Sequence, residues 1–131
     1  MDTTEATGKL LTPQEMVERT GVSVDTLRYY EREGLLGAVQ RASNGHRRYL
    51  ENDVLWVQVL RCLRETGMSM EDLRRYCELG AAGEATDAAR YELLLAHRRV
   101  VEQQMRDLEA ALELIEHKLA HYPQHHTGRS T

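Results

Sequence analysis

The side chains with the clearest capacity for chemistry are arginines and tyrosines clustered between residues 24 and 49. The acidic residues of this segment are Asp25, Glu31 and Glu33, and its arginines are Arg28, Arg32, Arg41, Arg47 and Arg48. The segment therefore carries a charge of +2, although the net charge of the chain is -4. A guanidinium group binds guanine edges through its bidentate fork and phosphates through its charge. A basic segment within an acidic chain is compatible with DNA binding.

Two thiols are the second candidate for chemistry. Cys62 and Cys77 lie fifteen residues apart, a spacing that fits neither a CxxC redox motif nor a zinc site. Because the chain shows no export signal, we expect reduced thiols rather than a disulfide. Cys77 comes four residues after Leu73, on the inward side of a predicted helix, and should be a buried structural cysteine.

Cys62 should lie away from the core, because two residues beyond Leu60 is about 200° around a helix. It would share a second face with Leu55 and Val59, which a dimer partner could cover. The arginines near it in sequence would favour its thiolate, whereas the nearby helix C-terminus would oppose a negative charge. We therefore take Cys62 as a candidate sensor residue, with a packing role as the open alternative.

Other kinds of chemistry are not indicated. No nucleophile–base pair, phosphate-binding loop or metal constellation emerges, so we expect no enzyme, no cofactor and no metal site. Aromatic residues make up 5% of the chain, with no Phe, which disfavours a large aromatic-walled ligand cavity. The first twenty residues lack an apolar segment, and the longest aliphatic run is too short to span a bilayer. We expect a cytoplasmic protein without membrane contact.

The basic segment needs a scaffold, and the sequence predicts a mostly α fold with a winged helix-turn-helix over residues 10–80. Thr12, Pro13 and Glu15 indicate a capped helix that ends at Gly21. After a three-residue turn, a second helix from Ser23 to Glu33 would be the recognition helix. The helical pattern then stops, and residues 37–49 predict a hairpin with a polar tip. A basic hairpin directly after a helix-turn-helix is typical of a wing.

Two further helices should complete this head. One begins at Asn52 or Asp53 and ends at Gly67, and Ser69 caps the other, which runs to about Leu79. Residues 80–83 read as a flexible break. The core face of the first of these helices should consist of Val54, Val57, Leu60 and Leu63.

The last long segment has the strongest periodicity. Within residues 84–122, ten positions alternate spacings of three and four residues, and only Arg98 among them is neither apolar nor aromatic. A lone helix cannot bury such a stripe, so we expect a coiled-coil homodimer. We expect residues 1–9 to be a flexible arm and residues 123–131 a disordered tail. The predicted dimerisation residues are Tyr91, Leu94, Val101, Met105, Leu108, Leu112, Ile115, Leu119 and Tyr122.

Double-stranded DNA is the partner that the head should read. On the recognition helix, the outward positions Asp25, Thr26 and Arg28 should face base edges. Tyr29 and the wing residues Arg47 and Arg48 should reach phosphates.

With these motifs the chain resembles the MerR family of transcription regulators. The resemblance implies a homodimer, joined by an antiparallel coiled coil, on a near-palindromic site within an overlong promoter spacer. Bending and untwisting that spacer would let RNA polymerase engage both promoter elements. The family's DNA contacts correspond to Arg28, Tyr29 and Arg47, with Arg48 and Tyr49 as further candidates. The residues that carry the resemblance include Thr26-Leu27-Arg28-Tyr29-Tyr30-Glu31, Gly45-His46-Arg47-Arg48-Tyr49 and Gly67-Met68-Ser69-Met70.

Comparison with the subgroups of that family narrows the kind of signal to which such a regulator would respond. The cysteine-containing loops of its metal sensors, the four cysteines of its iron–sulfur sensor and the ligand domain of its drug sensors have no counterpart in the sequence. What remains resembles thiol-dependent regulators that respond to aldehydes, other electrophiles or nitrosative stress. Two alternatives stay open: a regulator with a non-covalent small-molecule effector, and an architectural or excisionase-like DNA binder without a sensor. The long heptad segment disfavours the second. The promoter, the inducer and the choice between activation and repression stay open.

Overall fold

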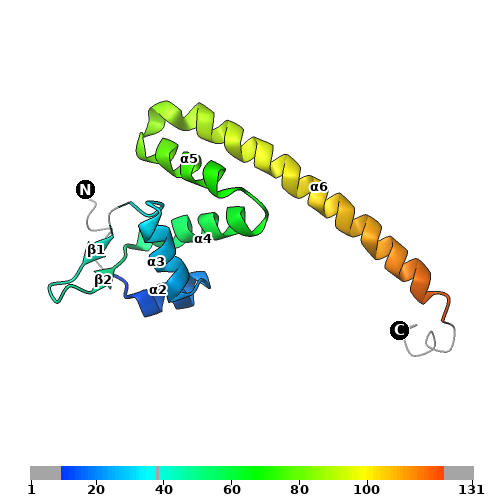
Figure 1. Cartoon of the computed structure of the whole chain (residues 1–131), viewed down its shortest axis with the longest axis horizontal. Helices are drawn as coiled ribbons and strands as arrows, with labels where there is room; N and C mark the ends of the chain where they lie inside the picture. Colours follow the sequence, from blue (N-terminus) through cyan, green and yellow to red (C-terminus); the bar gives the residue numbers. More distant parts are fainter. Residues whose placement is uncertain (1–9, 38, 123–131) are drawn as a thin grey trace. The chain divides into compact units, whose positions relative to one another are not determined.

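The computed structural model describes residues 10–37 and 39–122, and Figure 1 labels its elements. The expected arm and tail lie outside these residues. The chain divides into two compact units, the first ending at Leu94 and the second beginning at Leu95. The elements in chain order are α2 (Pro13–Thr20), α3 (Val24–Arg32), β1 (Gln40–Arg41), β2 (Arg47–Arg48), α4 (Glu51–Glu65), α5 (Met70–Ala81), the 3₁₀ turn η1 (Glu84–Thr86) and α6 (Asp87–Leu119). The predicted mostly helical fold, with a helix-turn-helix head and a long C-terminal helix, is confirmed.

Helix α2 begins and ends as its sequence predicts. The Thr12 hydroxyl accepts the Glu15 amide at 3.1 Å, and the Glu15 carboxylate accepts the Thr12 amide at 2.8 Å. Gly21 ends the helix in the left-handed region with a φ of 80°. A Cβ at Gly21 would displace the Nη1 end of the Arg61 side chain, and the left-handed backbone by itself favours glycine.

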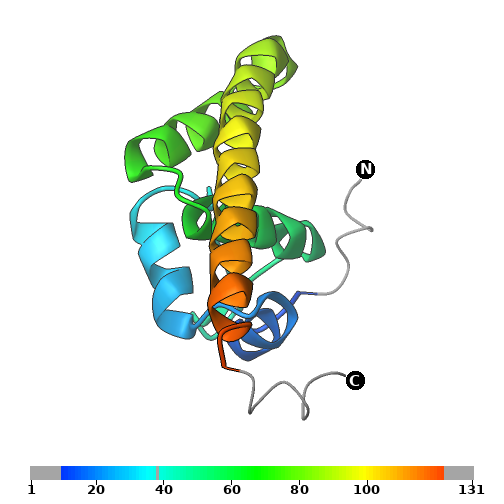
Figure 2. The same cartoon turned by 90° about the vertical axis from the view of Figure 1, so that its right-hand side faces the viewer.

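A single core holds the first unit together. Helix α2 packs against α3 and α4, as both views show (Figure 1, Figure 2). The predicted core face of α4 is confirmed, because all four of its residues are buried. Leu93, from the start of α6, also packs against this core, so the head extends beyond the break predicted at residues 80–83. The most deeply buried large side chains are Tyr49, Met16, Leu27, Leu60, Leu73 and Val57.

Two helix ends differ from the prediction. Helix α4 begins at Glu51 rather than at Asn52 or Asp53, because the Asp53 carboxylate accepts the Leu50 amide at 2.8 Å and so caps an earlier start. Burial raises the pKa of that Asp53 carboxyl. Helix α5 continues through Gly80 to Ala81, and the chain turns only at Gly83, whose φ is 91°. Glycine lowers helix stability by about 1 kcal/mol but does not end a packed helix.

Candidate nucleic-acid interface

The recognition helix α3 is held by two buried residues and a cap. Leu27 is fully buried and Tyr30 is nearly so, which fixes the inner face of the helix. The Ser23 hydroxyl accepts the Thr26 amide at 3.0 Å and lies 3.0 Å from the Thr26 hydroxyl. Helix α3 therefore has the buried and exposed faces that a groove-reading helix needs.

The predicted base-reading positions fall on the outer face of α3. Asp25 and Arg28 are exposed, and Thr26 is half-buried beneath them. The Tyr29 ring is also exposed and carries the Arg32 guanidinium 5.8 Å from its centroid. This cation–π contact limits the movement of the ring.

The wing is a two-stranded antiparallel hairpin in which Arg41 lies opposite Arg47. At its tip the Asn44 side chain accepts the His46 amide at 3.0 Å, and Gly45 adopts a φ of 86°. Arg48 is half-buried, and its Nη1 donates to the carbonyl of Arg47 at 2.8 Å.

Tyr49 corrects the sequence-based expectation of a DNA contact. Its side chain is only 1% exposed, and its backbone pairs with Leu11 through two hydrogen bonds of 2.8 Å. Burial raises the pKa of its hydroxyl. Tyr49 therefore anchors the base of the wing to the core.

Glu31 joins the wing to the recognition helix. Its carboxylate accepts a hydrogen bond from Nε of Arg47 at 2.5 Å and lies 3.4 Å from Nη2 of Arg41. The hydrogen bond raises the pKa of Arg47. Since Glu31 lies on α3 and both arginines lie on the hairpin, this cluster sets the position of the wing relative to the helix.

Arg28 meets the wing at a recess of about 180 Å³. This recess brings cationic side chains from two elements into one place, as an interface that contacts both the bases and the backbone of DNA requires. The sequence reasoning named Arg28 and Arg47 as site residues but gave no role to Arg41, His46 or Glu31. The residues that line the recess are Pro13, Val24, Arg28, Arg41, Gly45, His46, Arg47 and Tyr49.

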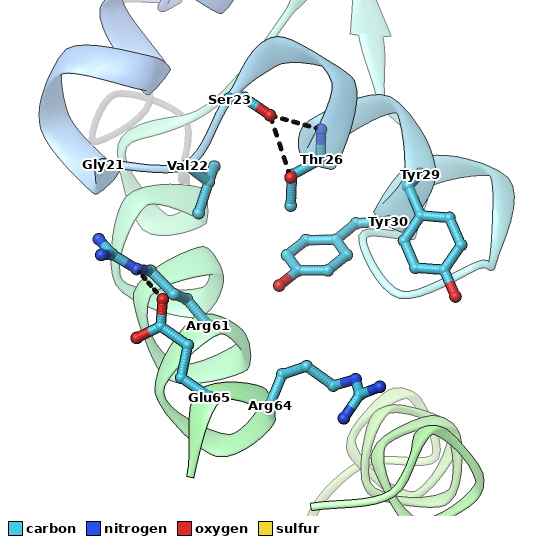
Figure 3. A pocket seen from close by; sticks show the side chains of 9 residues that line it. All are labelled: Gly21, Val22, Ser23, Thr26, Tyr29, Tyr30, Arg61, Arg64 and Glu65. Atoms are coloured by element: carbon cyan, nitrogen blue, oxygen red, sulfur yellow. Dashed lines mark hydrogen bonds and ion pairs between the residues drawn. The ribbon is translucent and has the colours of Figure 1, made fainter. Parts of the chain in front are cut away.

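A second recess, of about 360 Å³, separates α3 from α4 (Figure 3). Arg61 donates from Nε to Glu65 at 2.8 Å and from Nη1 to the Thr20 carbonyl at 2.9 Å. Arg64 donates to the Met68 carbonyl at 3.1 Å. Both arginines that were expected to favour a Cys62 thiolate are thus engaged with other partners.

The two thiols lie in the environments that the sequence predicts. Cys62 is exposed and Cys77 is buried, and both are free. Burial raises the pKa of the Cys77 thiol to about 11. Cys62 borders a recess of about 340 Å³, which is also lined by Thr20 at the end of α2 and by Gln58 and Arg61 of α4. Leu55 and Val59, which were expected beside it at a dimer contact, do not line this recess.

The predicted seam of α6 is largely uncovered within the single chain. Leu108 is 70% exposed, and Leu112 and Ile115 are more than half exposed.

Among residues 10–37 and 39–122, no helix is long and apolar enough to cross a membrane, and no group of His, Cys, Asp or Glu residues could hold a metal ion.

Comparison with known proteins agrees with this geometry. The family model described as MerR HTH family regulatory protein matches residues 11–79, and the model described as MerR, DNA binding matches residues 54–118. An HTH-type transcriptional regulator of uncharacterised function from Haemophilus influenzae is 39% identical over 85% of this chain and 82% of its own length. The HTH-type transcriptional regulator AdhR of Bacillus subtilis is 38% identical over 65% of this chain and 61% of its own length.

Solved structures give the same result. The crystal structure of HiNmlR, a MerR family regulator lacking the sensor domain and bound to promoter DNA, matches with a TM-score of 0.80 at 36% identity. The match covers 91% of this chain and 94% of that one. A MerR family transcriptional regulator from Listeria monocytogenes matches with a TM-score of 0.79 at 35% identity, over 92% of this chain and 91% of that one.

Proposed function

The chain belongs to the MerR family of DNA-binding transcription regulators, and we propose that it acts as a homodimer that remodels promoter DNA in response to a thiol-reactive signal. Family members are regulators and not enzymes. The observation that supports the DNA-binding part of this proposal is the cationic cluster where the recognition helix meets the wing.

The DNA contacts divide between the two elements. Arg28 lies on the exposed face of α3 and reads base edges together with Asp25 and Thr26. Arg47, held by Glu31, contacts phosphates with Arg41, and the Tyr29 hydroxyl does the same from α3. Arg48 is a further phosphate ligand at the edge of the wing.

Salt titration of DNA binding tests this division. Losing a base contact costs about 1–3 kcal/mol and relaxes sequence preference, whereas losing a phosphate contact weakens all sequences alike and lowers the salt slope by about one. We expect the first pattern for Arg28→Ala and the second for Arg47→Ala. Unchanged affinity in both variants would refute the assignment of this interface.

The homodimer forms through α6, and Arg98 favours an antiparallel arrangement. In a parallel pair, Arg98 would face Arg98 of the second copy inside the seam, with two like charges in contact. An antiparallel pair that matches all ten seam positions sets Arg98 against Ile115 and beside Glu116 of the other copy. The same register pairs Met105 with Leu108.

Disulfide trapping distinguishes the two arrangements. In a Cys62→Ser background, Met105→Cys and Leu108→Cys are prepared separately and then mixed. Antiparallel pairing predicts that the mixture forms a cross-linked heterodimer faster than either variant cross-links with itself, because like positions are offset by about 4.5 Å along the helices. A parallel dimer would instead cross-link each variant with itself, and would contradict the proposal.

The two heads of one antiparallel dimer bind the two halves of a near-palindromic site. The dimer then deforms the spacer between the promoter elements, and this deformation allows RNA polymerase to engage both elements. DNA deformation depends on the sequence that is bent, so it also adds specificity at bases the protein does not touch. Footprinting on promoter DNA tests this, because a protected site outside the spacer between the promoter elements would contradict it.

Cys62 is the proposed sensor. Its thiol adds to the carbonyl carbon of an aldehyde, so that a sulfur–carbon bond forms and the thiol proton passes to the carbonyl oxygen. The product is bulkier than the thiol and lies at the recess shared with Thr20 and Arg61. Because Arg61 binds the Thr20 carbonyl and Gln58 binds the Arg19 carbonyl at 3.2 Å, an adduct there changes how α4 holds the end of α2.

A reporter assay separates the two cysteines. Cys62→Ser should bind the promoter normally but fail to switch transcription when aldehyde is added. Cys77→Ser is the matched control and should keep the switch. A normal response by Cys62→Ser would favour the alternative of a non-covalent effector and leave only the regulator assignment.

A further inference from the structure

One cavity of the first unit takes no part in the proposed DNA and thiol chemistry. It has a volume of about 320 Å³ and lies where the segment after α3 meets α4, the end of α5 and the start of α6. This size is at the lower end of the range for small-molecule sites. Its walls include Leu35, Leu36, Trp56, Cys77, Gly80 and Arg90.

Trp56 gives the cavity a rigid apolar wall. Its indole Nε1 donates to the Leu35 carbonyl at 2.8 Å, which fixes the segment after α3 against α4. The ring also stacks on Tyr76 with a centroid distance of 5.7 Å and an interplanar angle of 15°. A preformed aromatic surface of this kind favours binding of a flat hydrocarbon group, because little side-chain freedom is left to lose.

Arg90 lines the same cavity and has an unused hydrogen-bond donor in its guanidinium group. One of its Nη atoms pairs with Asp87, but Nε is buried without a hydrogen-bond partner. Among the side chains that the structure describes, it is the one nitrogen or oxygen atom in this condition. A buried donor without a partner is unfavourable, and an acceptor on a bound molecule would satisfy it.

No carboxylate is among the residues that line the cavity. The Cys77 thiol has its pKa raised to about 11 and therefore stays neutral and unreactive at physiological pH. Gly80 presents no side chain, and a Cβ there would be in ordinary van der Waals contact with Trp56 and Arg90, which close the cavity on this side. Asp87 pairs with the guanidinium through a different nitrogen, Nη2.

We propose that this cavity is a non-covalent binding site for a small apolar carboxylate. The hydrocarbon part lies against Trp56 and the leucines, and the Arg90 side chain turns so that its guanidinium donates a hydrogen bond to the carboxylate. Such a ligand would contact the segment after the recognition helix and the start of α6 together. The site is separate from the recess beside Cys62.

Fluorescence of Trp56, the single tryptophan of the chain, reports binding directly. The full-length protein is titrated with 2-naphthoate and with the neutral 2-naphthamide. We expect saturable quenching by the acid and at least about tenfold weaker binding of the amide, because a hydrogen bond to a charged group is the stronger one. The Cys62→Ser variant should bind the acid as the parent does, which separates this site from the thiol sensor.

Substitutions at the cavity test where the ligand binds. Arg90→Leu should weaken naphthoate binding at least about tenfold, whereas Arg75→Leu, an exposed arginine on α5, should leave it unchanged. Gly80→Leu fills the cavity and should abolish quenching, and Gly80→Ala, whose methyl group meets only ordinary contacts, keeps the fold as a control. Equal binding of acid and amide, or full binding by Arg90→Leu, would overturn the proposal. Binding by a monomeric variant but not by the parent would also overturn it, since a second copy would then cover the cavity.

Discussion

The substitution Leu112→Lys tests the coiled-coil dimer most directly. Leu112 is 54% exposed in the single chain and lies near the middle of the predicted seam. Full burial of a leucine is worth about 2 kcal/mol, so covering the exposed half contributes about 1 kcal/mol per copy. A lysine there must also be partly desolvated, and even with its ammonium group extended toward water this costs about 1 kcal/mol or more. Two copies per dimer bring the total to about 4 kcal/mol.

That total corresponds to a roughly thousandfold weaker dimer. Sedimentation velocity across a concentration series should therefore show monomers where the parent protein is dimeric, and promoter affinity should fall because two half-sites are no longer read together. Ala110→Lys introduces a lysine on the opposite face of α6 and should leave the dimer intact. A dimer of unchanged affinity for Leu112→Lys would refute the seam assignment.

Three further predictions follow from contacts in the head. Glu31→Ala removes a negative charge beside DNA but also releases the wing arginines, so it should lower promoter affinity severalfold. Fluorescence anisotropy should also show weaker discrimination against a scrambled duplex. Tighter specific binding would show that Glu31 does not hold the wing. Gly21→Ala should lower the free energy of unfolding in urea by about 2–3 kcal/mol, from the left-handed backbone and the displaced Arg61. Gly34 is the control, because its φ is 78° and nothing lies within 4 Å of a Cβ there. Gly34→Ala should therefore lower the free energy of unfolding only by the cost of the left-handed backbone, about 1–2 kcal/mol. Equal losses in the two variants would show that the Arg61 contact contributes nothing. The thiol of Cys77 has its pKa raised from 9.0 to about 11, so the folded state keeps a proton that the unfolded state releases, and stability should fall between these pH values in the parent but less in Cys77→Ala.

The helical head could be predicted because its signals are local. The capping box of Thr12 and Glu15, the turn at Gly21 and the cap at Ser23 each act within a few residues, and each formed as predicted. The start of α4 was missed by one residue because Asp53 acts as a cap acceptor rather than as a cap residue.

The wing was less predictable because its contacts are distant in sequence. Two arginines followed by a tyrosine resemble one continuous DNA-binding run, yet Tyr49 pairs with Leu11 and is buried. Alternation over a strand of two residues cannot indicate which segment lies beside it. Glu31 was counted only as an opposing charge, since nothing local shows that the hairpin folds back to place Arg47 against it.

The acidic residues near the interface explain how a chain with a net charge of -4 can bind DNA. Glu31 pairs with two wing arginines, and Glu33 pairs with Arg74 of α5 at 2.5 Å. A carboxylate that is already paired adds little repulsion toward phosphate, because its field is largely cancelled at the distance of the DNA backbone. Its main effect is then to fix the arginine, which lowers the entropy lost when the arginine binds phosphate. Arg28 has no such ion pair among the described residues and stays free to adjust to a base edge. The proposed division between fixed phosphate contacts and an adjustable base contact thus rests on which arginines the acidic residues hold.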